Sequence, residues 1–125
     1  EIFSSHLLEH FPEEHLVRKA LPHWKGLLKA GGLFRAVVPD AEAMIRGYAA
    51  GEFPYQSLRE VTFGAQDYDG DFHYNMFTPE SLAQLLVDVG FEQVEVLAEG
   101  RRNGACLEFE IQGVKTWPPE EPHNS

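Results

Sequence analysis

A nearly uninterrupted apolar segment over residues 33–38, LFRAVV, most constrains how this chain folds. Gly31 and Gly32 precede the segment, and Pro39 and Asp40 end it. A strand with apolar residues on both faces is typical of a parallel sheet that helices cover. The segment therefore predicts a layered α/β domain in which this strand is buried.

The segments on either side have the periodicities of helices and strands. Apolar residues at three- and four-residue steps predict helices, and alternating apolar residues predict strands. The predicted elements are a strand over 2–5, a helix over 12–30 with a kink or break at Pro22, the strand over 33–38, helices over 41–50, 55–63 and 79–89, and strands over 94–98 and 105–111. Asp40 and Thr78 are predicted helix caps, and a hairpin-type connection is expected over 99–104. This order predicts an α/β/α layered fold with an antiparallel hairpin at one edge.

Composition narrows the classes of partner. Ten basic and twenty acidic residues give a formal net charge of -10. This balance argues against nucleic-acid and membrane-surface partners, because Lys and Arg supply most of the affinity for phosphate. Cys106 is the single cysteine, so no internal disulfide forms and a reducing, cytoplasmic location is expected. No apolar run approaches the ~20 residues of a membrane span.

The limits of the domain are also predicted. Residues 1–112 are expected to form the folded part, and residues 113–125, with three prolines and no periodicity, are expected to form a flexible tail. The chain begins with Glu1 and continues directly into apolar Ile2 and Phe3. This start suggests the inside of a structural element, and we expect the chain to be incomplete.

Five short segments in a fixed order carry a family resemblance. They are LLEHF at 7–11, KAGG at 29–32, VPD at 38–40, FTPESL at 77–82, and Gly90 and Phe91 followed by Val94. In this order the chain resembles the class I S-adenosylmethionine-dependent methyltransferases over residues 1–112. The resemblance implies the carboxyl-terminal half of a Rossmann-like sheet, a methyltransferase as the parent protein, S-adenosylmethionine as its cofactor and a small molecule as its methyl acceptor.

The same resemblance exposes a missing part. The family holds its cofactor with a glycine-rich loop after its first strand, and no such run precedes Glu1. Gly31 and Gly32 end a predicted helix and do not replace that loop. We therefore expect this isolated chain to be inactive and to bind no cofactor. We also expect a homo-oligomer that covers the exposed first strand, because bare strand edges favour self-association.

The turn after the first strand is the predicted cofactor-facing segment. In open α/β sheets, ligands bind beyond the carboxyl ends of the parallel strands. By the resemblance, Ser5, His6 and Leu7 flank the cofactor and the reacting methyl group. The alternative interpretation is a polar turn that leads into a helix.

Residues 52–77 form the predicted substrate segment. They combine seven aromatic residues with acidic residues and His73, and long ordered loops are often functional. Asp67, Tyr68, His73 and Tyr74 are the predicted substrate contacts. His73 is the predicted general base, because histidine titrates near neutral pH. The alternative is a packed aromatic loop with surface acids, which would suit a noncatalytic module whose role is association.

A metal site is the remaining hypothesis. His6, Glu9 and His10 stand at positions i, i+3 and i+4, so they can share one side of a helical turn, and His73 can add a ligand. Some members of the family hold a divalent metal here with a Glu-x-x-Glu-His group. In this chain His6 stands at the position of the first glutamate of that group. The histidine-rich set suits zinc or another transition metal better than magnesium. The prediction for this chain is nevertheless that no metal binds, with Glu9 and His10 capping and tethering the helix start, and the metal site of His6, Glu9 and His10 is the alternative.

Overall fold

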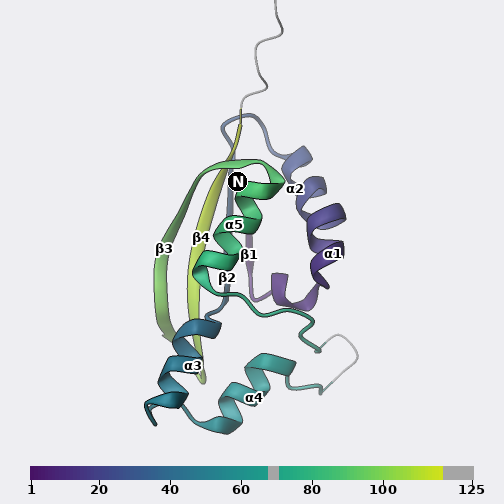
Figure 1. The fold of residues 1–125 in the computed structure, drawn as a ribbon. Coiled ribbons are helices and arrows are strands. Elements are labelled where there is room, and N and C mark those ends of the chain that lie inside the picture. The colour runs from purple at the N-terminus through teal and green to yellow at the C-terminus, as the bar shows by residue number, and fades with distance from the viewer. Residues whose placement is uncertain (68–70, 117–125) are drawn as a thin grey trace, which may run out of the picture.

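The computed structural model describes residues 1–67 and 71–116, and it contains a four-stranded mixed sheet. The strands are β1 (Ile2–Ser5), β2 (Leu33–Pro39), β3 (Phe91–Asn103) and β4 (Cys106–Lys115), in the spatial order β1-β2-β4-β3 (Figure 1). β1 and β2 are parallel, whereas β4 runs antiparallel to both β2 and β3. This arrangement confirms the predicted α/β sheet with an antiparallel hairpin at one edge.

The first helical segment is irregular, in line with the kink or break predicted at Pro22. A 3-10 turn, η1 (Leu8–His10), is followed by α1 (Glu13–His15), a π-helical turn η2 (Leu16–Ala20) and α2 (Leu21–Leu27). Proline has no N–H for the helical hydrogen-bond ladder, and its ring crowds the preceding turn. The wider π turn directly before Pro22 accommodates this without ending the helix.

Two of the other three helices begin at their predicted caps, Asp40 and Thr78. The three helices are α3 (Ala41–Ala49), α4 (Tyr55–Phe63) and α5 (Pro79–Val89). The Asp40 carboxylate accepts a hydrogen bond from the Ala43 N–H at 3.0 Å, which satisfies an otherwise free donor in the first turn of α3. Thr78 and Ser81 form a reciprocal capping box at the start of α5.

The hairpin differs from the prediction. β3 continues to Asn103 and pairs there with Cys106, so the connection predicted over 99–104 is shorter than expected. The pairing register shifts between Val96 and Arg101, as at a β-bulge. This irregularity allows Gly100, whose φ is 56°, to lie within the strand. β4 extends to Lys115, beyond the expected boundary at residue 112, and residues 117–125 of the predicted tail lie outside the described residues.

One face of the sheet carries the main core. The α1–η2–α2 segment and α5 lie over this face (Figure 1), and β2 and β4 contribute aromatic and branched side chains that are fully buried. The largest fully buried side chains of this core, from the helices and the strands together, are Phe34, Phe109, Leu8, Leu16, Leu21, Leu82, Leu86 and Ile111. Burial of these side chains is the main stabilising term of the fold.

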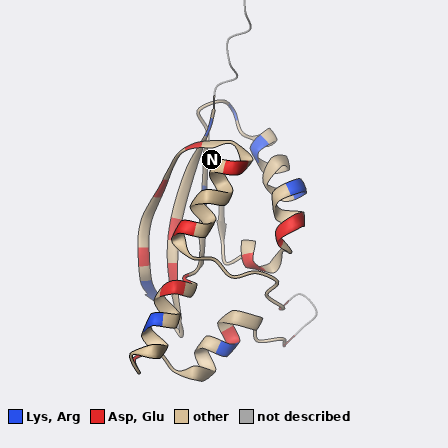
Figure 2. Cartoon of the chain, viewed as in Figure 1, with Lys and Arg blue, Asp and Glu red and all other residues tan. Residues whose placement is uncertain are grey.

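The opposite face of the sheet carries a row of ion pairs. Arg35 of β2 lies 3.7 Å from Glu1 and 3.4 Å from Glu110, and Arg101 pairs with Glu110 and Glu108. The pairing register places Arg35, Glu110 and Glu108 on one face, because Arg35 is opposite Gln112 and Glu110 is opposite Val37. Figure 2 shows further acidic residues along β3 and α5, whereas basic residues are scattered over several elements. Within the described ranges, no helix has the length and apolarity needed to cross a membrane.

Candidate functional site

The candidate site lies where β1 and β2 end. These strands are parallel, so their carboxyl ends meet at one edge of the sheet, which is the usual ligand edge of an open α/β fold. His6 follows β1 with a left-handed φ of 54°, and its N–H donates to the Val37 carbonyl of β2 at 2.8 Å. A non-glycine residue in this conformation is strained, and such strain is concentrated at functional sites.

The His6 ring lies between two carboxylates. Its Nε2 atom is 2.9 Å from Glu108 Oε1, and its Nδ1 atom is 3.7 Å from Glu9 Oε2. The side chain of His6 is 31% exposed, whereas those of Glu9 and Glu108 are 2% and 6% exposed. The predicted cofactor-facing residue His6 is therefore committed to contacts within the chain.

Glu108 is the anchor of this arrangement. Its carboxylate accepts hydrogen bonds from His6 and from Asn103, the latter at 2.7 Å, and from Arg101 Nε at 2.8 Å and Nη2 at 2.5 Å. Burial raises the pKa of Glu108, but the hydrogen bonds from His6, Asn103 and Arg101 outweigh it and hold the pKa at about 2. Glu108 is therefore ionised at neutral pH.

Glu9 has the opposite environment. The residue is 1% exposed, and neither carboxylate oxygen has a hydrogen-bond partner. Burial raises the pKa of Glu9 above the ordinary value, and the nearby backbone N–H of Glu9 itself and the neighbouring histidines His6, His73 and His10 oppose this shift without cancelling it. A buried carboxylate without partners is costly, so it favours either a proton or a bound cation.

Two imidazoles lie beside this carboxylate. His10 and His73 meet edge to face with their ring centroids 4.6 Å apart. His10 Nδ1 donates to the Phe72 carbonyl at 3.0 Å, and His73 Nδ1 donates to the Val61 carbonyl at 2.5 Å. The Nδ1 atom of each ring is thus held by a backbone carbonyl, an arrangement that commonly orients metal-binding histidines.

Glu9, His10 and His73 together form what we call the carboxylate–imidazole group. Each offers one ligand atom, and these atoms lie within 4.8 Å of one another. One carboxylate and two imidazoles are donors that suit zinc or another divalent transition metal, with further positions open to water or substrate. The residues present therefore fit a divalent transition metal.

The segment that carries His73 is fixed by backbone hydrogen bonds. The Glu9 carbonyl accepts from the Tyr74 N–H at 2.8 Å and the Asn75 N–H at 3.1 Å, and the His73 N–H donates to the Phe63 carbonyl at 3.1 Å. At the start of the segment, Gly64 has a φ of 82°, and a Cβ added to it would overlap the Asp71 carbonyl oxygen. Close backbone packing thus brings His73 beside residues more than 60 positions earlier.

The predicted residues are only partly brought together. His6 lies outside the carboxylate–imidazole group, whereas His73, predicted as an additional ligand, belongs to it. Asp67 is exposed, its backbone N–H donates to Asp71, and the Tyr74 side chain is 64% exposed. Tyr68 lies outside the described residues.

Sequence reasoning missed Glu108. The alternation over residues 105–111 predicts that Glu108 lies on the wetter face of its strand, but the structure buries its side chain, which is 6% exposed. Its role depends on the strand register, in which Glu108 lies opposite Pro39 at the end of β2. A single sequence does not specify that register.

The residues present do not by themselves make a cradle for a nucleoside cofactor. The described connections from β1 to η1 and from β2 to α3 contain no glycine. Each oxygen of the Asp40 carboxylate, which follows β2, already accepts one backbone hydrogen bond, from the Ala43 N–H at 3.0 Å and from the Gly100 N–H at 2.9 Å. That Ser5, His6 and Leu7 flank such a cofactor remains a prediction.

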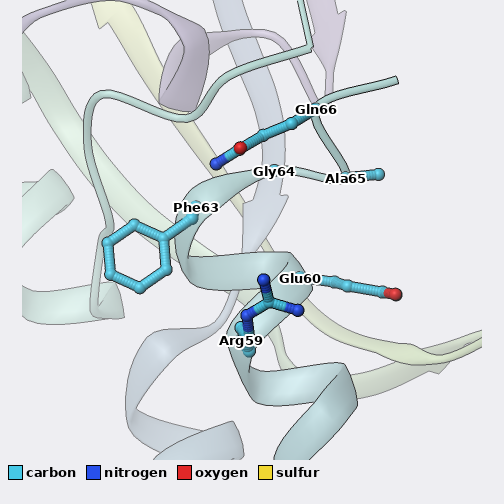
Figure 3. Close-up of a pocket in the computed structure, with 6 residues that line it drawn as sticks. All are labelled: Arg59, Glu60, Phe63, Gly64, Ala65 and Gln66. Carbon is cyan, nitrogen blue, oxygen red and sulfur yellow. The ribbon is translucent and has the colours of Figure 1, made fainter.

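A separate small pocket lies at the end of α4. Figure 3 shows its lining, which consists of Arg59, Glu60, Phe63, Gly64, Ala65 and Gln66. It has a volume of about 120 Å³, which is small for a drug-sized ligand. None of the predicted site residues lines it, so we place the candidate site at the carboxylate–imidazole group instead.

Comparisons with known proteins show the fold. No protein-family model and no curated protein matches the sequence. Among solved structures, the chain is similar to the apo form of the S-adenosylmethionine-dependent methyltransferase SibL, with a TM-score of 0.61 and 16% sequence identity. The match covers 93% of this chain and 30% of that chain, so this chain spans less than a third of the length of SibL. The chain therefore has a Rossmann-like, methyltransferase-like fold.

Proposed function

We propose that this chain is the carboxyl-terminal half of an S-adenosylmethionine-dependent methyltransferase domain that acts on a small molecule. The observation that carries the proposal is the fold match, which aligns almost the whole chain with one part of a larger methyltransferase. The five sequence segments that resemble this family support the same assignment. The acidic balance of the chain supports a small-molecule acceptor over a nucleic acid.

The chain's own contribution in this proposal is positioning. Methyl transfer is an in-line displacement, so the protein mainly holds the donor and the acceptor in line. The turn at residues 5–7 would flank the donor, and the segment over 71–77 would contact the acceptor, with His73 as a base where the acceptor carries a proton. The isolated chain is proposed to be inactive, because its described turns form no cofactor cradle. The cytoplasmic location and the homo-oligomer through β1 remain predictions.

Two measurements test this proposal. The first is calorimetric titration of the purified chain with S-adenosylmethionine, for which we expect no stoichiometric binding. Tight binding would contradict the claim that the cofactor-binding part lies elsewhere. The second is the coding sequence upstream of Glu1, where we expect a strand followed by a glycine-rich loop. A stop codon directly upstream would contradict the proposal and favour a noncatalytic association module.

A second candidate function is divalent metal binding by the carboxylate–imidazole group. The specific observation that favours it is the Glu9 carboxylate, which is buried, has no hydrogen-bond partner and lies beside the imidazoles of His10 and His73, with one ligand atom of each residue within 4.8 Å of the others. When bound, the metal would supply a Lewis acid beside the acceptor segment. In this arrangement His73 acts as a ligand and not as the general base.

Metal analysis tests the second candidate. The chain is purified without added metal, and its metal content and thermal midpoint are measured before and after chelator treatment. We expect a transition metal near one equivalent and a lower midpoint after the metal is removed, because binding to the folded state stabilises it. A metal-free chain whose midpoint the chelator and added Zn²⁺ both leave unchanged would contradict the candidate.

A further inference from the structure

We propose that a groove between α3 and the end of the β3–β4 hairpin binds a small molecule with one carboxylate and an apolar body. This α3 groove has a volume of about 350 Å³, and ligand pockets usually have volumes of about 300–1,000 Å³. Its lining includes two arginines, Arg46 of α3 and Arg102 of β3, and no residue of the carboxylate–imidazole group. The proposal depends on neither function proposed above, so its test is separate from theirs.

One wall of the α3 groove is a face of the helix. The residues that line this wall are Ala43, Arg46, Gly47 and Ala50. Their spacing of i, i+3, i+4 and i+7 places them on one side of α3. The three small residues leave room for a ligand beside the helix, and Arg46 contributes a positive charge.

Backbone hydrogen bonds hold the other walls against α3. The N–H groups of Glu52 and Phe53 both donate to the Gly47 carbonyl, at 2.8 and 3.1 Å, which turns the chain back beside the helix. The Asp40 N–H donates to the Leu107 carbonyl at 2.8 Å, which joins the hairpin to the start of α3. Figure 1 shows α3 beside this end of the hairpin. The groove is therefore formed by paired backbone and is present before a ligand binds.

The inner surface of the groove is apolar. Phe53 is 6% exposed, and the half-buried Leu107 lines the groove from the hairpin. Gly47 allows the close packing of Phe53, because a Cβ at Gly47 would lie 3.1 Å from the Phe53 Cβ. A ligand with an apolar body would cover these carbon atoms, which favours its transfer from water.

The arginines give the groove a preference for an anion. Among the residues that the structure describes, Arg102 has no ion-pair partner. Arg46 pairs with Glu42 at 2.7 Å, but these side chains are 78% and 45% exposed, and such surface pairs are weak. Figure 2 shows basic residues on α3 and at the neighbouring end of β3. Both guanidinium groups therefore have N–H donors available for a carboxylate.

The surrounding acidic residues limit the ligand to one negative charge. Glu52 also lines the groove, and Glu42 and Glu99 line an adjoining hollow that shares Ala43 and Arg46 with it. The chain as a whole has a formal charge of -10, so the attraction for an anion is local. These carboxylates oppose a dianion such as phosphate, whereas a monocarboxylate needs a single guanidinium group.

The test uses hexanoate as the probe and hexanamide as its neutral counterpart. Two-dimensional amide NMR spectra of the full chain are recorded at pH 7 and low salt during titration with each compound and with inorganic phosphate. We expect saturable hexanoate binding with a Kd of about 1 mM and the largest shifts at Ala43, Gly47, Phe53 and Leu107. Hexanamide should bind at least about fivefold more weakly, because it forms no ion pair. Phosphate should give no saturable shifts at these amides.

Two substitutions remove the charge and the space separately, each with a matched control. Arg102→Gln should weaken hexanoate binding about fivefold or more, whereas Arg59→Gln, which removes an exposed arginine of α4, should stay within about twofold of the wild type. Ala50→Leu fills the groove and should weaken binding by a similar factor. Ala49→Leu adds the same side chain at an exposed position that does not line the groove, so binding should be unchanged. All four positions are exposed, and the dispersion of each spectrum shows that the variant is folded.

Each contrary result overturns a stated part of the proposal. Hexanoate titrations without saturable shifts at the groove would refute the site. Equal binding of hexanoate and hexanamide, or equal weakening by Arg102→Gln and Arg59→Gln, would refute the role of the guanidinium group. Saturable shifts with phosphate would refute the preference for a monoanion with an apolar body. Equal effects of Ala50→Leu and Ala49→Leu would place the ligand outside the groove.

Discussion

His6 Nε2 donates a 2.9 Å hydrogen bond to Glu108 Oε1, which joins the end of β1 to a side chain 102 residues later. This contact links the parallel and antiparallel parts of the sheet at the edge where the candidate site lies. Glu108 in turn is bonded to Arg101 and Asn103 of β3. One buried carboxylate therefore ties three strands together around the site.

Glu108→Gln is expected to lower the free energy of unfolding by about 2 kcal/mol at pH 7, because hydrogen bonds to a buried charge are lost. The pKa of Glu108 falls from an ordinary 4.5 to about 2 on folding, so its stabilising contribution is full above pH 4.5 and lost as pH falls through 2. The difference between wild type and variant in urea unfolding should shrink over that window. The control is Glu42→Gln. Glu42 forms an exposed i,i+4 ion pair with Arg46, so we expect this substitution to lower the free energy of unfolding by less than about 0.5 kcal/mol. A pH-independent difference would contradict the account.

Asp40 is expected to be a structural carboxylate. Its two oxygens cap α3 through Ala43 and bind the Gly100 N–H in the irregular part of β3. Asp40→Ala should cost about 2 kcal/mol, since both bonds are lost, and Asp40→Asn should cost about half of that, since one acceptor remains. Thermal or urea unfolding measures both values. Equal losses in the two variants would show that the hydrogen bond kept by Asp40→Asn adds nothing, and no loss in Asp40→Asn would show that the bond it gives up adds nothing.

Gly64→Ala is expected to damage the metal site from a distance. The added Cβ would meet the Asp71 backbone, which begins the segment that carries His73. We expect a loss of about 2 kcal/mol in unfolding free energy and weaker Zn²⁺ binding. Gly51→Ala is the control: its φ is also positive (77°), but its Cβ meets open space, so about 1 kcal/mol should be lost with Zn²⁺ affinity unchanged. Equal Zn²⁺ affinity in both variants would contradict the role of the segment.

Association through β1 remains a prediction, and Phe3 tests it. β1 is at one end of the described sheet, and Phe3 is 50% exposed beneath the Arg35 guanidinium. Phe3→Asp should shift sedimentation of the chain from dimer to monomer, because it places a charge on the pairing edge. Val87→Asp on α5, which is 51% exposed, should leave the oligomer intact. A wild-type chain that sediments as a monomer at its highest soluble concentration would rule out the dimer.

The local parts of the fold were predictable from sequence. The apolar run of β2, the caps Asp40 and Thr78, and the irregular helix around Pro22 each depend on neighbours within a few residues. The hairpin connection was predicted wrongly, because Gly100 has the character of a turn residue but lies in a bulged strand. Local pattern does not distinguish these two uses of glycine.

The candidate site was predictable only in part. Glu9, His10 and His73 were recognised by residue type and, for the first two, by helical spacing. Their convergence depends on backbone hydrogen bonds from Tyr74 and Asn75 to the Glu9 carbonyl, and no local pattern encodes these bonds. The role of Glu108 likewise depends on strand register, which only the folded chain specifies.

The most direct test of the account is calorimetric titration of Zn²⁺ into the metal-free chain and into Glu9→Gln, a variant of nearly equal size. We predict one equivalent of Zn²⁺ for the wild type and no saturable binding for the variant. Folding raises the pKa of Glu9, so the ionised side chain destabilises the folded metal-free chain increasingly as pH rises above 4.5. Glutamine does not ionise. The metal-free variant should therefore melt at a higher temperature than the metal-free wild type, and the difference should grow with pH. Equal Zn²⁺ binding by both proteins, or binding by neither, would contradict the assignment of Glu9 as a metal ligand.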